Sequence, residues 1–376
     1  MTPADMTPAD MSPTGMSPAD EPPARFRDEG SVSNWRQEPT RIFQHKNKEV
    51  ALTHLDRVYF PAVGLRKGDL VDYYLKVAPY LLPHLKDRPL TLERWPEGLE
   101  DGSFFQKDAA PYFPTWLRTF PVERKDHQKI VHYPLVEDEA DLLYLVNLGT
   151  LTFHTQLSRI TDPDHPDLMV LDIDPPEGPR VGESTGAAGQ PEAAKSPGEA
   201  EQPKAAEPPD IAEPPGVAQL PDIAESPQES EFRRAAAVAL LLRDELIALG
   251  MEPLVKTSGK RGVHLAFRLT EKMDYTQARA WLNKLFADLA RRHPDLLTTE
   301  IRKEKRHGRV YLDALRMSPG ATIVPPYVVR ATPMATVSTP VTWEELSALG
   351  DAQPYTVSTV PTRLAERGDL WGGLVS

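Results

Sequence analysis

The spacing of apolar residues divides much of the chain into helices and short strands. Helical spacing runs through four segments: 68–83, 137–149, Phe232–Leu249 and Tyr275–Arg292. Gly250 and Pro294 follow the last two as stop signals, and the capping-box pattern of Thr342 and Glu345 predicts one more short helix. The β-rich runs are shorter and lie at Leu168–Asp174, Pro253–Thr257, Val263–Leu269 and Arg309–Leu315. Because helices and strands do not alternate regularly, this pattern predicts an α+β fold of packed lobes rather than βαβ winding.

Two segments lack any such periodicity. Residues 1–30 open with a degenerate five-residue repeat of Met, Thr or Ser, Pro and Ala, and residues 179–230 are rich in Pro, Ala, Glu and Gly. Neither segment can present an apolar face to a core, so both are predicted to be disordered. The ordered domain is therefore expected over residues 31–376, with 179–230 as an acidic insertion.

The net charge of −12 is concentrated in the same two segments. Residues 1–30 hold six acids against two bases, and residues 181–230 hold ten acids against two bases. The remainder is neutral overall, so the acidity of the whole chain does not argue against a nucleic-acid enzyme. The absence of cysteine excludes disulfides and thiolate metal sites. With no apolar run of membrane-spanning length and no secretory signal, we expect a cytoplasmic protein without a membrane segment.

Three aspartates stand at the ends of β-rich runs. Asp172 and Asp174 are two residues apart, so in a strand both project from one face, and Asp313 ends a later run. Close carboxylates repel one another unless a cation lies between them. Such oxygen ligands suit magnesium or manganese, and two-metal phosphoryl transfer uses a set of this kind. The alternative is that these are ordinary strand-end acids facing water.

The loop from Lys256 to His264 combines a serine, two glycines and several bases. Backbone amides and cations in such a loop can hold a phosphate, although the Walker A spacing is missing. In the run that follows, His264 falls on the face opposite Leu265 and Phe267, which argues against a core histidine. The alternative is a basic surface hairpin.

Two further clusters contain basic residues. Residues 303–309 bring several cations close to Asp313, and Arg94 precedes Phe104, Phe105 and Lys107. Aromatic side chains interleaved with bases can stack on nucleotides and hold phosphates. The alternative is that the aromatic residues belong to the core and that the charged residues form an ordinary solvent-exposed face.

In order and spacing, these motifs resemble the polymerase module of bacterial DNA ligase D, a branch of the archaeo-eukaryotic primase superfamily that works in non-homologous end joining. Asp172-x-Asp174 resembles the first motif of that family, Ser258 to His264 the second, and Asp313 the third, followed by 320–322 and 326–330. The likeness covers most of residues 45–370 outside the insertion. It implies a bilobed primase-polymerase fold with two mixed β-sheets flanked by helices and an RRM-like catalytic part.

The resemblance also implies roles for matched positions. Asp172, Asp174 and Asp313 would be catalytic and bind two divalent cations, with manganese preferred and magnesium as the alternative. The residues implied in binding the incoming NTP or dNTP are His154, Ser258, Arg261, His264, Lys303, Arg306 and Arg330. Those implied in binding DNA are Arg57, Lys67, Arg94, Phe104, Phe105 and Lys107, of which Arg57 and Lys67 would grip a recessed 5′ phosphate.

Several positions depart from the family pattern. Arg57 replaces a usual lysine, Glu93 stands where a basic residue is common, and 314–317 replaces a more polar stretch. The long insertion after the first motif is also unusual.

The expected activity is template-directed addition of nucleotides, ribonucleotides in particular, to primer 3′ ends at DNA breaks and gaps. A primer-independent primase, a DNA-end bridging module with vestigial catalysis and a two-metal nuclease are the alternatives. The expected partners are gapped duplex with a 5′ phosphate, Ku and a separately encoded DNA ligase. The expected location is the nucleoid of a bacterial or archaeal cytoplasm.

Overall fold

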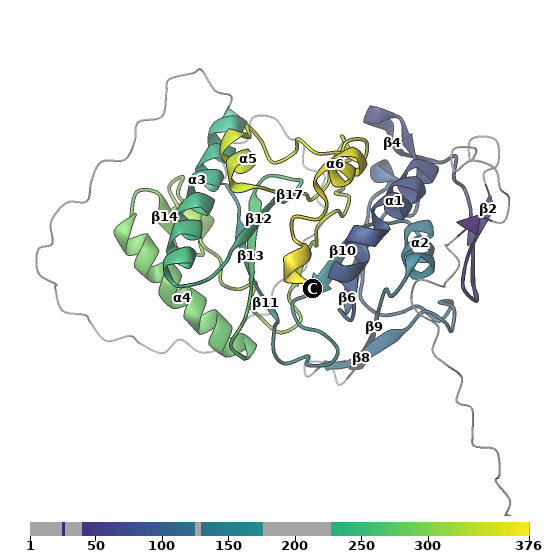
Figure 1. Cartoon of the computed structure of the whole chain (residues 1–376), viewed down its shortest axis with the longest axis horizontal. Coiled ribbons are helices and arrows are strands. Elements are labelled where there is room, and N and C mark those ends of the chain that lie inside the picture. Colours follow the sequence, from purple (N-terminus) through teal and green to yellow (C-terminus); the bar gives the residue numbers. More distant parts are fainter. Residues whose placement is uncertain (1–24, 27–39, 125–128, 176–226, 376) are drawn as a thin grey trace, which may run out of the picture.

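A computed structural model describes residues 25–26, 40–124, 129–175 and 227–375, which form two lobes (Figure 1). The helices are α1 (Lys67–Leu85), α2 (Glu139–Asn147), α3 (Pro227–Ala248), α4 (Tyr275–Arg292), α5 (Trp343–Ala348) and α6 (Val360–Arg367). The strands of the first lobe are β1 (Arg25–Phe26), β2 (Arg41–His45), β3 (Lys48–Leu52), β4 (Val58–Phe60), β5 (Leu65–Arg66), β6 (Leu90–Arg94), β7 (Phe104–Gln106), β8 (Thr119–Arg124), β9 (Lys129–Pro134), β10 (Thr150–Gln156) and β16 (Thr322–Ile323). Those of the second are β11 (Leu168–Ile173), β12 (Leu254–Thr257), β13 (Val263–Arg268), β14 (Leu297–Thr298), β15 (Val310–Tyr311) and β17 (Pro340–Val341).

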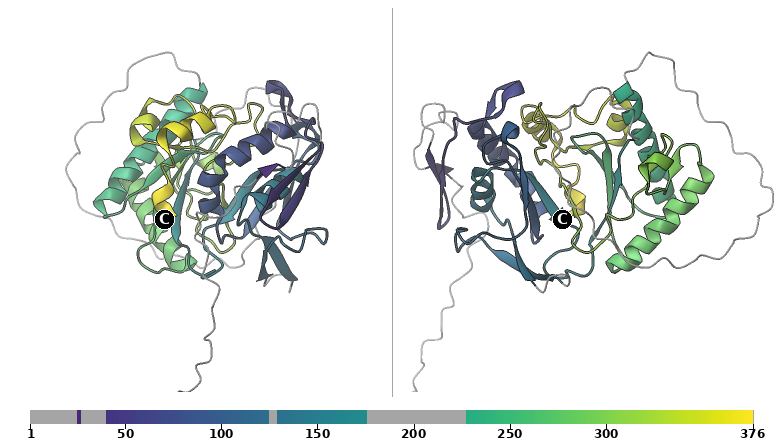
Figure 2. Two further views of the ribbon diagram at one scale, coloured as in Figure 1. Left: turned by 45° about the vertical axis from the view of Figure 1, so that its right-hand side comes forward. Right: turned by 180° about the vertical axis from the view of Figure 1, so that it is seen from behind.

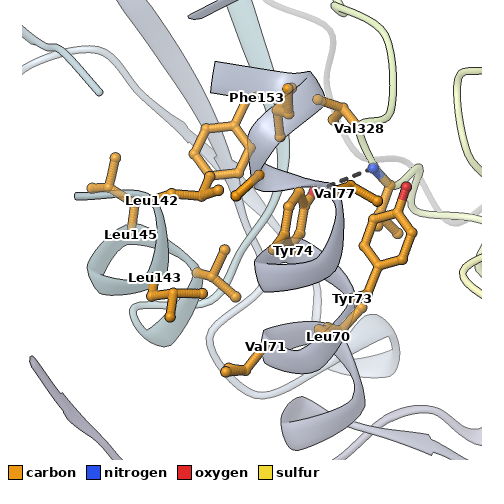
Figure 3. Packing of buried hydrophobic residues seen from close by; sticks show 14 of the residues in the cluster. Leu70, Val71, Tyr73, Tyr74, Val77, Leu142, Leu143, Leu145, Phe153 and Val328 are labelled. Atoms are coloured by element: carbon orange, nitrogen blue, oxygen red, sulfur yellow. Dashed lines mark hydrogen bonds between the residues drawn. The ribbon is translucent and has the colours of Figure 1, made fainter. Parts of the chain in front are cut away.

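The first lobe is built around an antiparallel sheet in the order β16-β10-β6-β7. Helices α1 and α2 contribute the apolar side chains that pack against it (Figure 3). Tyr74 of α1 contacts Phe153 of β10 edge to face, with ring centroids 5.6 Å apart, and donates a hydrogen bond to the Leu151 carbonyl at 2.6 Å. The helix is thereby fixed against the strand that also carries His154.

The second lobe contains an antiparallel sheet in the order β11-β13-β12-β17. Helices α3 and α4 lie on its outer side, away from the first lobe, as the view from behind also shows (Figures 1 and 2). Strand residues alternate between faces, so Leu171 and Leu265 lie in the core of this lobe. Their neighbours Asp172 and His264 are paired in register and occupy the opposite face.

The two lobes are interwoven in sequence. The first core takes residues from the N-terminal half, and also Val324–Val337 and Val357–Leu364 from near the C-terminus. The second core takes Val341–Ala352 and Trp371–Leu374 from between and beyond these segments. The chain therefore passes repeatedly from one lobe to the other.

The predicted elements agree with the structure apart from some boundaries. The mixed α+β class is confirmed, although within both four-stranded sheets every strand pair is antiparallel, and the parallel pair among the described strands is β14–β15. Gly250 has φ +81° after α3, and its amide bonds to the Ile247 carbonyl at 2.9 Å, as a C-terminal cap requires. Thr342 and Glu345 form the capping box of α5.

Three predicted segments differ in extent. The β-rich run Arg309–Leu315 is a strand only at Val310–Tyr311, because the Asp313 side chain accepts a hydrogen bond from the Leu315 amide at 2.7 Å and turns the chain. Residues 25–26 of the predicted N-terminal tail pair with β2, and 227–230 of the predicted insertion lie in α3. The rest of both segments, 1–24, 27–30 and 179–226, lies outside the described residues. Among the described residues, no helix has the length and apolar character needed to span a bilayer.

Candidate active site

A cleft of about 770 Å³ is lined by residues of both lobes. The first lobe contributes His154 from β10 and Arg330, while the second contributes the ends of β11 and β13. All ten residues predicted for catalysis or nucleotide binding line this cleft: His154, Asp172, Asp174, Ser258, Arg261, His264, Lys303, Arg306, Asp313 and Arg330. The fold therefore gathers side chains that are up to 176 residues apart in sequence.

Asp172 has a defined partner for each carboxylate oxygen. Its Oδ1 lies 3.4 Å from Nε2 of His264, and its Oδ2 lies 2.9 and 2.8 Å from Nε and Nη2 of Arg316. Its backbone also forms a bridge with that of Asp313. Burial alone would raise the pKa of Asp172, but His264 and Arg316 outweigh it and hold the pKa below its usual range.

Asp174 stands at the end of the same strand, on the wall of the cleft. Surrounding protein atoms and the charge on Asp172 raise its pKa to about 6. Gly262 passes close by: a Cβ there would lie 2.2 Å from the Ile173 carbonyl oxygen and 3.1 Å from Oδ1 of Asp174. Only glycine lets the loop approach the strand end this closely.

The three aspartates supply hard oxygen donors, the kind that magnesium and manganese take. Across the described ranges, however, no group of three or more His, Asp or Glu side chains is arranged to hold a metal ion. The cation beside Asp172 is instead the guanidinium of Arg316. The three aspartates are thus ligands of the type that divalent cations take. In this structure, however, the charge of Asp172 is balanced by Arg316.

The loop between β12 and β13 is closed by Ser258. Its Oγ accepts hydrogen bonds from the amides of Lys260 at 3.2 Å and Gly262 at 3.1 Å. Gly259 has φ +70°, and a Cβ there would lie 2.8 Å from Cγ of Arg330, so the loop packs directly on that arginine. The Nε of Arg330 is buried without a hydrogen-bond partner in the described structure. A buried, unsatisfied cationic donor beside a cleft is suited to receiving an anion.

Lys256 is a residue of this site that sequence reasoning missed. It is fully buried, pairs in register with His264, and its Nζ lies 2.7 Å from Nδ1 of His264. Burial first, and then Lys256, lower the pKa of His264 to about 4. Because the Asp172 carboxylate can only accept, the neutral imidazole is expected to have its proton on Nε2, which leaves Nδ1 to accept from Lys256. The available signal was a lysine inside the predicted strand Pro253–Thr257, two residues before Ser258.

On the opposite wall, His154 lies between Glu93 and Phe105. Its Nε2 is 3.5 Å from Oε2 of Glu93, and its ring meets that of Phe105 edge to face at 5.6 Å. Glu93 is buried, and although burial raises its pKa, His154 and Lys260 lower it further. The acid at this unusual position is therefore charged and paired with the cleft histidine.

The aromatic pair of β7 is exposed, with accessible fractions of 47 % for Phe104 and 52 % for Phe105. Arg94, predicted to bind DNA, is buried beneath them: its guanidinium donates to the Leu148 carbonyl and Gln106 and lies 5.2 Å from the ring of Phe104. Arg94 therefore supports strand β7 through its contacts with Phe104 and Gln106. Lys107 follows the pair and is exposed.

Arg57 and Lys67 lie together but do not line the cleft. The Lys67 amide bonds to the Arg57 carbonyl at 2.8 Å, and the Lys67 Nζ bonds to the Thr53 carbonyl at 2.8 Å. Arg57 pairs with Glu97 at 2.7 Å. Burial first, and then the Arg57 charge, lower the pKa of Lys67 to about 8. Lys67 also begins α1, so the helix N-terminus adds to this cationic site.

Curated relatives share sequence with most of the chain. The multifunctional non-homologous end joining DNA repair protein LigD of Mycobacterium tuberculosis is 28% identical over 331 residues, 86% of this chain and 36% of the relative. The bifunctional non-homologous end joining protein LigD of Bacillus subtilis is 27% identical over 321 residues, 85% of this chain and 43% of the relative. The chain thus spans well under half the length of these relatives.

A solved structure and a family model agree with these matches. The polymerase domain of Mycobacterium tuberculosis ligase D, solved in complex with DNA, has a TM-score of 0.68 and 27% identity, covering 87% of this chain and 98% of that one. Residues 66–193 and 226–371 match the model of the LigD primase-polymerase domain. Since this match covers more than half of the chain, the chain belongs to the LigD primase-polymerase domain family.

Proposed function

We propose that the chain is a template-directed nucleotidyl transferase that extends primer 3′ ends at DNA breaks and gaps during non-homologous end joining. The observation that carries this proposal is the convergence of Asp172, Asp174 and Asp313 with Arg330 on one cleft. Carboxylates on one side and a buried, unsatisfied arginine on the other suit a triphosphate that reacts at its α-phosphate.

Each group in the cleft has a proposed task. Asp172, Asp174 and Asp313 would hold two divalent cations, manganese by preference or magnesium, which when bound lower the barrier to 3′-hydroxyl attack and stabilise the leaving pyrophosphate. Arg330 would neutralise the triphosphate, together with Arg261, Lys303 and Arg306 from the second lobe. Ser258 keeps the loop closed against Arg330, and His264 orients Asp172.

The first lobe would position nucleotide and DNA. Phe104 and Phe105 present exposed rings on which a base can stack, and the ring of Phe105 contacts the cleft histidine His154. The separate cationic site of Arg57 and Lys67 would bind the 5′ phosphate on the far side of a gap. Lys107 would contact the DNA backbone, and Arg94 would act by holding β7 in place.

A labelled primer on a gapped duplex tests this proposal. Extension should require template and divalent cation, increase when the gap carries a 5′ phosphate, and be greater with NTP than with dNTP. Dinucleotide synthesis on bare template without a primer would instead identify a primase. Loss of the labelled end in manganese without nucleotide would identify a nuclease. A protein that binds ends but never extends them would be a bridging module.

The relatives named above are end-joining proteins, which motivates a proposal on partners. Ku and a DNA ligase activity are the proposed partners of this domain. Addition of Ku should raise extension across two separate DNA ends, where one end supplies the template, more than extension on a gapped duplex with an unbroken template strand. Equal extension of both substrates would remove the support for a Ku partnership.

A further inference from the structure

Arg316 is placed by the turn that follows Asp313. Ala314 and Met317 on either side of it are buried in the core of the second lobe, and the Met317 amide bonds to the Ala314 carbonyl at 3.1 Å. Asp313 itself accepts the Leu315 amide. With both ends of the turn fixed, the side chain of Arg316 extends into the cleft, which it lines.

The guanidinium of Arg316 contacts the carboxylate of Asp172, which the proposed metals need as a ligand. Its Nε and Nη2 lie 2.9 and 2.8 Å from the same oxygen, Oδ2 of Asp172, and so use both lone pairs of that atom. The other oxygen, Oδ1, faces His264. Both oxygens of Asp172 are therefore engaged by side chains of the protein.

The two partners differ in their freedom to move. The Asp172 side chain is 10 % exposed and held by its strand, whereas the Arg316 side chain is 44 % exposed. The guanidinium of Arg316 can rotate into water and be hydrated there, whereas the Asp172 carboxylate left behind is buried and then needs another cation in its place. The pair is thus suited to opening when a stronger cation arrives.

We infer that Arg316 is a built-in cation that holds the carboxylates in the metal-free enzyme and must leave Asp172 before a divalent cation can bind. This inference rests on the proposed two-metal function. Arg316 acts as a positioning residue that competes with the metal. When a site is open in only a fraction of the molecules, the apparent Kd for its ligand equals the Kd of the open site divided by that fraction. The arginine therefore lowers the metal affinity of the free enzyme.

Manganese binding to the nucleotide-free enzyme tests this inference without an activity assay. Free Mn²⁺ is measured by electron paramagnetic resonance during titration of wild type, Arg316→Gln and Arg309→Gln. Arg309 is the matched control: it also lines the cleft, but its guanidinium bonds to the backbone carbonyls of Lys305 and Arg306. Arg316→Gln should bind Mn²⁺ roughly tenfold more tightly, as expected if the pair is closed about 90% of the time. Arg309→Gln should stay within about twofold of wild type, because it removes equal charge but no carboxylate contact.

The possible outcomes separate the inference from the function. Equal or weaker Mn²⁺ binding by Arg316→Gln, or an equal gain in Arg309→Gln, would overturn the inference and leave the two-metal proposal standing. Failure of wild type and variant alike to bind Mn²⁺ would overturn both. Arg316→Lys keeps the charge but loses the two-point contact, so it should bind Mn²⁺ with intermediate affinity. If Arg316→Gln does not fold, the Mn²⁺ affinity of Arg316→Lys still tests the inference: affinity equal to or weaker than wild type would overturn it.

Discussion

Lys67 is a residue whose charge state depends on the fold. Burial and the neighbouring Arg57 lower its pKa to about 8, so the amine is mostly charged at pH 7 and mostly neutral at pH 9. A neutral lysine cannot attract a phosphate. Stimulation of gap filling by a 5′ phosphate should therefore fall as the pH rises from 7 to 9.

The comparison of Lys67→Arg with wild type checks this prediction, because arginine stays charged throughout that range. The ratio of extension with and without the 5′ phosphate is measured at each pH. The ratio should fall in wild type and remain level in the variant. An equal decline in both proteins would show that Lys67 is not the titrating group.

Gly262 is a second residue with a specific steric constraint. A methyl group at this position would overlap the Ile173 carbonyl oxygen, a backbone atom that cannot rotate away. Gly262→Ala should therefore lower the free energy of unfolding by about 1–3 kcal/mol. Urea denaturation measures this change, and Gly373→Ala, where a Cβ meets no atom within 4 Å, is the matched control. Equal stability of the two variants would contradict the close approach.

At the level of elements, strand alternation accounts for the part of the site that could be predicted. The alternation of apolar neighbours predicts that Asp172 and His264 lie on polar faces of their strands, and the structure pairs these two residues across β11 and β13. The contact of Asp172 with Arg316 could not be predicted, because it joins residues 144 positions apart through a turn. The same limit applies to Lys256 and Ser338, which meet only when β12 packs against the segment before β17.

The element β7 carries a prediction about nucleotide binding. Phe105 is about half exposed and contacts His154. Its removal should therefore weaken nucleotide binding by loss of stacking, with little effect on the free energy of unfolding. Stacking of a base on an aromatic side chain contributes about 1–3 kcal/mol. Phe105→Ala should raise the KM for the incoming nucleotide roughly tenfold with little change in kcat.

Ile130→Ala is the control for this prediction, because Ile130 is an apolar side chain of another strand, β9, and is as exposed as Phe105. Steady-state extension kinetics compare the two variants. An unchanged KM in Phe105→Ala, or an equal rise in both, would argue against a stacking site at β7.

At the scale of the whole molecule, the interwoven lobes should unfold together. Residues 324–337 and 357–364 complete the first core, and the segment between them packs in the second. Neither core can be assembled without chain segments that cross to the other lobe. Urea unfolding should therefore give coincident transitions by circular dichroism and tryptophan fluorescence. Two separated transitions would show that the lobes fold independently.

The overall architecture was predictable in class but not in connectivity. Periodicity located the helices 67–85 and 275–292 within a residue or two, since each has an apolar face and the second also has a stop signal in Pro294. The return of residues 324–337 to the first lobe was not predictable, because the turns and isolated bridges there have no hydrophobic period. The cleft depends on this return, which brings Arg330 opposite Asp172.

The most direct test of the central claim is single-nucleotide extension of a primer in manganese by Asp172→Ala and Asp313→Ala, beside Glu304→Gln. Glu304 is a carboxylate of the same cleft outside the proposed metal set. We predict a loss on the order of a thousandfold in both aspartate variants, because each removes several kcal/mol of charge stabilisation, and near wild-type extension in Glu304→Gln. Extension at the wild-type rate by either aspartate variant would contradict the assignment of this cleft as the catalytic site.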